Sequence, residues 1–204
     1  MYKKRYGLMA FLVFGCVSCA QANTPISLTH LLQQYHSFSA NFTQVTTLGS
    51  GDQRKASGQL WIAKPNRFRW QVLKPHKQLY LSNGKQVWTY DQDLQQATVQ
   101  PLSSRLQGTP ALLLSGKITK LYQWFAVKKL GPQQFLLTPK KADSLLQSIT
   151  LQFNTQQQLQ RLMVRNTTGQ VTQVTFENIQ LNPVIAPSQF VFVPPKGVDV
   201  LRAQ

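Results

Sequence analysis

Residues 67–73 read RFRWQVL, and this stretch decides the fold class. Phe68, Trp70 and Val72 alternate with basic and amide residues, which gives a period of two. Successive side chains of an extended strand point to opposite faces, so the apolar side chains share one face and the polar ones share the other. The stretch therefore predicts a β-strand with one buried face and one solvated face.

The same alternation recurs along the rest of the chain, at 86–90 (QVWTY), 133–138 (QQFLLT), 148–153 (SITLQF), 160–164 (QRLMV) and 171–179 (VTQVTFENI). Turn signals separate these segments, among them Ser82-Asn83-Gly84, Gly131-Pro132 and Asn182-Pro183. The spacing predicts a mainly β, antiparallel domain of roughly ten strands. No internal repeat or linker divides it.

Two segments depart from the period of two and are predicted to be helices. In residues 24–38 the apolar positions follow the i, i+3, i+4, i+7 pattern of one helix face, namely Leu28, Leu31, Leu32 and Tyr35, with Thr24 or Ser27 as the cap. Residues 109–116, TPALLLSG, form a shorter apolar turn. Because two short helices cannot cover both faces of a large sheet, we expect a curled sheet with a helical lid over one face.

The first 22 residues resemble a secretory signal peptide. Lys3, Lys4 and Arg5 precede an apolar run, and Ala20-Gln21-Ala22 is a suitable cleavage site. This predicts a signal peptide at 1–22, a single domain at 23–204 and export across the inner membrane. An alternative uses Cys16 or Cys19 as the lipidated cysteine of an anchored lipoprotein.

The chain carries a formal net charge of +16 with only six acidic residues. Such a charge is common in nucleic-acid-binding proteins. Export argues against nucleic acid as a partner, and the basic residues are mostly scattered singly among apolar neighbours, as on the solvated face of a sheet. Two explanations of the positive charge remain, namely attraction to acidic partner proteins and attraction to anionic lipid headgroups.

The sequence offers little for catalysis. His30, His36 and His76 do not follow a metal-binding spacing, so no metal and no cofactor are expected. Asp91 and Asp93 follow a strand in a turn-like context, where a structural role is favoured over acid–base chemistry. We therefore expect that the protein is not an enzyme, and a secreted hydrolase is only a distant alternative.

Several longer motifs closely resemble one known family, the periplasmic outer-membrane lipoprotein carriers (LolA family). They are FSANFTQ (38–44), GQLWIAKPNRFRW (58–70), LSNGKQVWTYDQDLQQATV (81–99), TPALLLSG (109–116), FLLTPK (135–140) and FVFVPPKGVDV (190–200). The resemblance implies an incomplete, strongly curved antiparallel β-barrel, with a helical lid over an apolar cavity that receives the acyl chains of lipoproteins. It also implies a monomer with two protein partners, an inner-membrane lipoprotein-releasing ABC transporter and an outer-membrane receptor. A lipid-anchored receptor or an envelope sensor of similar fold is the second alternative.

The resemblance also suggests roles for individual residues. Lys64 stands where the family usually has an arginine that latches the sheet to the lid, and we expect it to reach carbonyls near Ser115 and Gly116. Phe68 corresponds to a large hydrophobe at the cavity mouth that contacts cargo or a partner. Candidates for the acyl-cavity lining are Phe42, Leu60, Ile62, Trp70, Leu79, Leu81, Val87 and Trp88, with Leu32, Leu112 and Leu113 from the lid. Strand alternation requires that some of these side chains face outward.

Overall fold

A computed structural model describes residues 27–102, 110–141 and 145–202. Its helices are α1 (Leu28–Gln33), α2 (Pro110–Ser115), α3 (Ile118–Trp124) and the 3₁₀ turn η2 (Pro187–Phe190). Its strands are β1 (Ser37–Thr47), β2 (Gln53–Ala63), β3 (Arg67–Lys74), β4 (Gln78–Asn83), β5 (Gln86–Asp91), β6 (Gln96–Pro101), β7 (Phe125–Gly131), β8 (Gln134–Pro139), β9 (Leu146–Phe153), β10 (Leu159–Asn166), β11 (Val171–Leu181) and β12 (Asp199–Arg202). The predicted signal peptide lies outside the described residues.

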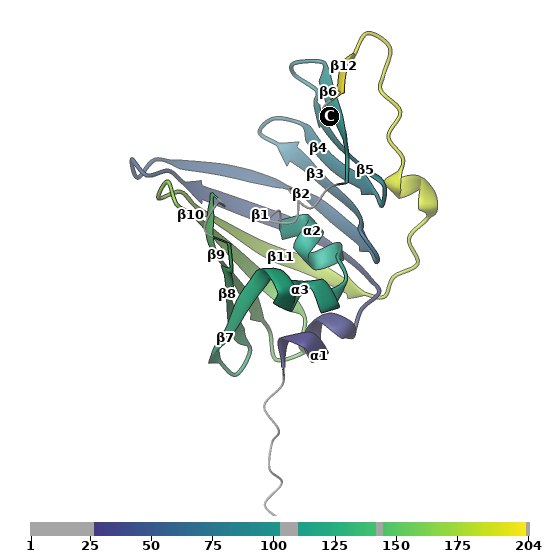
Figure 1. The fold of residues 1–204 in the computed structure, drawn as a ribbon. Coiled ribbons are helices and arrows are strands. Elements are labelled where there is room, and N and C mark those ends of the chain that lie inside the picture. Colours follow the sequence, from purple (N-terminus) through teal and green to yellow (C-terminus); the bar gives the residue numbers. More distant parts are fainter. Residues whose placement is uncertain (1–26, 103–109, 142–144, 203–204) are drawn as a thin grey trace, which may run out of the picture.

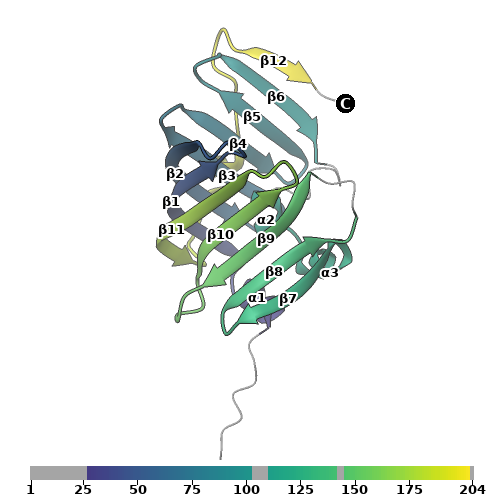
Figure 2. The same ribbon diagram turned by 90° about the vertical axis from the view of Figure 1, so that its left-hand side faces the viewer.

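All twelve strands belong to one sheet, in the order β12-β6-β5-β4-β3-β2-β1-β11-β10-β9-β8-β7. Neighbours are antiparallel except β12, which pairs in parallel with β6. The sheet curls around α2 and α3, and its edge strands β12 and β7 lie apart (Figure 1). Figure 2 shows the molecule after a quarter turn, with β8 to β11 in front of the helices. The predicted curved, open β fold with a few helices is confirmed.

The helices differ from the predictions in two details. Ser27 caps α1, since its hydroxyl accepts a hydrogen bond from the backbone N–H of His30 at 3.2 Å. The helix ends at Gln33, so the predicted extension to Tyr35 is wrong, although Tyr35 is still buried. The helix α3 was missed, because it has no side-chain cap and runs directly into β7.

The concave face holds the main core, and β3 contributes to it as its alternation predicts. Phe68, Trp70 and Val72 are buried. The Trp70 ring centroid lies 4.7 Å from that of Phe42 and 6.3 Å from that of Phe176, so β3, β1 and β11 meet through aromatic contacts. Aromatic pairs of this kind stabilise a core beyond their area burial.

A second apolar layer covers part of the convex face, where the C-terminal segment crosses β3 to β6. The Phe192 ring centroid lies 5.4 Å from that of Trp88 and 5.2 Å from that of Tyr90. Arg69 Nη1 donates to the carbonyl oxygen of Gln189 at 3.4 Å. The chain therefore buries apolar side chains on both faces of this half of the sheet.

At Gly58 on β2, the neighbouring strands leave no space for a side chain, and we predict that Gly58→Ala destabilises the fold. A Cβ at this position would sit 1.9 Å from the backbone oxygen of Gln71 and 2.9 Å from the Phe42 ring. Overpacking of this kind costs about 1–3 kcal/mol. Urea unfolding should show the loss, whereas Gly131→Ala, where a Cβ would meet nothing within 4 Å, should leave the unfolding midpoint nearly unchanged.

Candidate functional site

The concave side of the sheet forms an open cavity of about 1380 Å³. Its lining comes from β1 to β11 and from the helices α2 and α3. Buried apolar side chains make up one part of the wall: Phe68, Trp70, Val72, Val87, Ala111, Phe125, Leu162 and Val174. The volume exceeds the roughly 300–1,000 Å³ of pockets that hold drug-sized ligands, so a long flexible group has room here.

The structure places the predicted lining residues in three groups. Trp70, Val87 and Phe68 line the cavity. The second group, Phe42, Leu60 and Ile62, belongs to the same buried cluster but lies behind the cavity surface. From the predicted lid, Leu32 and Leu113 are buried in this cluster too, while the side chain of Leu112 lies outside the described residues.

The third group was assigned to the wrong face. Leu81 pairs with Arg69 on β3 and with Trp88 on β5, and Leu79 pairs with Gln71. Cross-strand partners point to the same side of a sheet, and on β3 that side is opposite to Trp70. Leu79, Leu81 and Trp88 therefore belong to the convex apolar layer and do not line the cavity.

Lys64 connects the β2–β3 turn to the lid through α1. Its Nζ donates to the carbonyl oxygen of Leu32 and lies 3.9 Å from the ring centroid of Tyr35. The prediction that Lys64 bonds to carbonyls at the end of α2 is therefore wrong. The Ser115 carbonyl there accepts a hydrogen bond from the backbone N–H of Asn66 at 2.8 Å. The turn thus contacts two lid helices, one through a side chain and one through the backbone.

The environment of Lys64 favours loss of its proton. Burial lowers the pKa of the Lys64 ammonium to about 8, because desolvation penalises the charged form. The Leu32 carbonyl at the end of α1 and the face of the Tyr35 ring both attract a cation. The ammonium is therefore charged at neutral pH and becomes neutral as the pH rises above 8.

Prediction from the sequence missed the other half of the cavity wall. Val174 of β11, Leu162 of β10 and Ala111 of α2 contribute apolar surface, and Trp124 of α3 joins them. The alternation on β10 and β11 could have identified Leu162 and Val174. Trp124 could not be found, because α3 itself was not recognised.

Among the acidic and histidine residues of the described part of the chain, His76 Nδ1 and Asp93 Oδ2 lie 2.7 Å apart, and both side chains are exposed. The Asp91 carboxylate accepts the backbone N–H groups of Asp93 and Leu94 at 3.0 and 3.1 Å, which confirms the predicted turn role. A hydrogen bond from Gln78 is the main reason that the pKa of Asp91 is lowered. Within residues 27–102, 110–141 and 145–202 there is no group of three potential metal ligands. Nor does any helix of these ranges have the length and hydropathy to cross a membrane.

A curved sheet wrapped around a large, partly apolar cavity is suited to binding an apolar ligand. The comparisons identify the group more closely: residues 33–193 match the model of the outer membrane lipoprotein carrier protein LolA, and the chain belongs to this family.

Two curated relatives and one solved structure illustrate the likeness. The outer-membrane lipoprotein carrier protein of Chromohalobacter salexigens is 37% identical, over 98% of this chain and 97% of the relative. That of Pseudomonas paraeruginosa is 40% identical, over 86% of each chain. An uncharacterized conserved protein from Thermus thermophilus shares the fold alone, with a TM-score of 0.51 at 12% identity over 85% of this chain and 97% of that one.

Proposed function

We propose that this protein is a periplasmic carrier that holds the acyl chains of lipoproteins and delivers them to the outer membrane. The observation that carries the proposal is the cavity of about 1380 Å³ with its wall of buried aromatic and aliphatic side chains. Membership of the carrier family supports it, because the curated relatives are named outer-membrane lipoprotein carrier proteins.

Transfer between membranes needs such a cavity for energetic reasons. Each buried methylene contributes about 0.8 kcal/mol, so a lipoprotein with several long chains leaves a bilayer very slowly. A carrier must shield the chains from water and still release them to the next acceptor. Binding that is coupled to a lid with open and closed states, separated by a few kcal/mol, meets both demands.

The compartment and partners follow from this role. The chains to be carried come from the inner membrane, so a releasing machine must load them, and we propose an ABC transporter there. A receptor at the outer membrane then accepts them. The excess of basic residues suits acidic surfaces on these partners. The alternatives of a receptor, a sensor or a hydrolase lack an observation that favours them over a carrier.

Copurification tests the carrier function directly. The protein should be expressed as the full chain and purified from a periplasmic extract without detergent, and intact lipoprotein should accompany it in mass spectrometry. A variant with Trp70→Glu, which places a charge in the cavity wall, should lose the lipoprotein. Equal recovery with the parent and with this variant would contradict the proposal.

Processing separates the carrier from an anchored receptor. We expect cleavage after Ala22, so that the mature chain begins with unmodified Asn23, because the Ala20-Gln21-Ala22 site fits a signal peptidase. Intact-mass measurement on the periplasmic protein checks this. A diacylglyceryl mass on Cys16 or Cys19 would instead assign the chain to the anchored receptors.

A further inference from the structure

The cavity wall changes character at the same level on three neighbouring strands. On β1 the concave positions run from Phe38 and Phe42 to Gln44 and Thr46. On β11 the corresponding change is from Phe176 and Val174 to Thr172, and on β2 it is from Ile62 and Leu60 to Arg54. The register confirms that these positions are level, because Thr46 pairs with both Arg54 and Thr172. The concave wall therefore has an apolar end near the helices and a polar end near the β1–β2 and β10–β11 turns.

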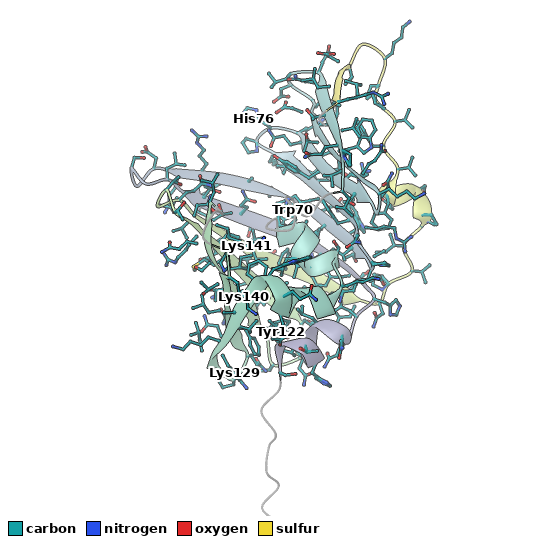
Figure 3. The ribbon with its side chains drawn as sticks, viewed as in Figure 1. Trp70, His76, Tyr122, Lys129, Lys140 and Lys141 are labelled. Carbon is teal, nitrogen blue, oxygen red and sulfur yellow. The ribbon has the colours of Figure 1, made fainter. Side chains whose placement is uncertain are left out.

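The polar end is also cationic. Arg54, Lys55, Lys140 and Lys141 lie in the cavity lining with amide and hydroxyl side chains around them. The described lining contains no aspartate or glutamate. Figure 3 shows Lys140 and Lys141 on the side of the cavity beside α3, with Trp70 between the sheet and α2. A negatively charged group that enters the polar end thus meets basic side chains in the lining.

Two of these cations are available to a ligand. Lys140 Nζ already donates to the carbonyl oxygen of Tyr122 at 2.7 Å. Arg54, Lys55 and Lys141 are exposed, and none of them forms an ion pair or side-chain hydrogen bond with another described residue. Lys55 pairs with Val45 across β1 and β2, so its Cβ points to the convex side, away from the cavity. The hydroxyls at this level are engaged with one another, as Thr46 Oγ1 and Thr172 Oγ1 lie 3.2 Å apart. Arg54 and Lys141 are therefore the groups that can bind an anion here.

We propose that the cavity also binds free amphiphilic lipids with an anionic headgroup, either fatty acids or acidic phospholipids. The acyl chain lies against Trp70 and Val174 in the apolar end, and the carboxylate or phosphate lies between Arg54 and Lys141. Charge-assisted hydrogen bonds favour the anionic headgroup over a neutral one. Like the carrier function, this inference requires a cavity that accepts acyl chains, but it adds selection by headgroup charge.

Tryptophan fluorescence can measure this binding, because Trp70 and Trp124 line the cavity while Trp61 and Trp88 face the other side of the sheet. The protein is expressed as the full chain with Trp61→Phe and Trp88→Phe and purified from a periplasmic extract. Short-chain lipids with brominated acyl groups are then added below their micelle concentration: phosphatidylglycerol, phosphatidylcholine and a fatty acid. Bromine quenches a tryptophan that it contacts, so quenching reports a chain in the cavity.

We expect phosphatidylglycerol or the fatty acid to bind about threefold to thirtyfold more tightly than phosphatidylcholine at low salt, as two exposed ion pairs can provide. High salt should reduce the difference. Arg54→Glu with Lys141→Glu should reverse it. The matched control is Arg161→Glu with Arg165→Glu, which makes the same change in net charge. Both arginines are exposed on β10, and they point away from the cavity because their neighbours Leu162 and Val164 line it. This control should keep the preference for the anionic lipids.

Two results would overturn the inference. One is equal affinity for the anionic and the neutral lipids in the parent protein, and the other is an equal loss of preference in both double variants. Copurified lipoprotein together with either result would leave the carrier function intact. If none of the lipids quenches the fluorescence, headgroup binding is also refuted. The copurification experiment then decides the carrier function separately.

Discussion

Phe68→Glu should abolish loading of lipoprotein while the protein remains folded. Phe68 is 3% exposed and lines the cavity, so the substitution places a carboxylate where acyl chains must lie. If an acyl chain buries this charge without a partner, its binding free energy becomes less favourable by several kcal/mol. The empty protein avoids most of that cost, because the glutamate can extend into the water of a cavity of about 1380 Å³. Uptake from inner-membrane vesicles measures loading, and circular dichroism checks the fold.

A milder pair of substitutions separates loading from packing. Phe68→Leu and Phe135→Leu each remove part of a buried ring in the same core, but only Phe68 is part of the cavity lining. Both should lower the unfolding midpoint by similar amounts, and only Phe68→Leu should slow loading. If Phe68→Glu loads at the parental rate, or if the two leucine variants load equally, Phe68 is an ordinary core residue.

The sequence predicts which residues of a strand share a face, but it does not say which face is concave. Alternation correctly groups Phe68 with Trp70 and Leu79 with Leu81. Both pairs are buried, so hydrophobicity alone suggested the same role for both. They differ because the C-terminal segment folds back over β3 to β6 and buries Leu79 and Leu81 on the convex side. That contact joins residues distant in the chain, and no local pattern reveals it.

A similar limit applies to the cavity and its lid. The apolar pattern of α1 and the cap at Ser27 are local features, so the helix was predicted. The position of α1 against the β2–β3 turn depends on long-range packing, and this explains why Lys64 was expected at α2 instead. The cationic end of the cavity was missed for the same reason, since Arg54 and Lys141 are far apart in the chain and line one cavity only when the sheet curls.

Lys64→Leu should accept lipoprotein normally but deliver it poorly. The Lys64 ammonium donates to the Leu32 carbonyl, and its own backbone N–H donates to the His36 carbonyl at 2.8 Å, so the β2–β3 turn holds α1 in place when the cavity is empty. Bonds that exist only in the closed, empty state favour the release of cargo. Leucine removes the side-chain bond and the cation–ring contact, which stabilises the loaded protein relative to the empty one. Receptor-dependent transfer to outer-membrane vesicles measures the effect.

Lys64→Arg is the matched control, because it keeps the charge and adds donors in a planar fork. It should transfer at least as well as the parent at pH 7. A second comparison uses pH: the pKa of Lys64 is lowered to about 8, so from pH 7 to pH 9 the parent loses most of its charge while arginine keeps it. Transfer by the parent should therefore decline over this interval relative to the arginine variant. Equal transfer by the parent, leucine and arginine proteins at both pH values would show that Lys64 does not act as a latch, since neither its hydrogen bond nor its charge would then contribute to release.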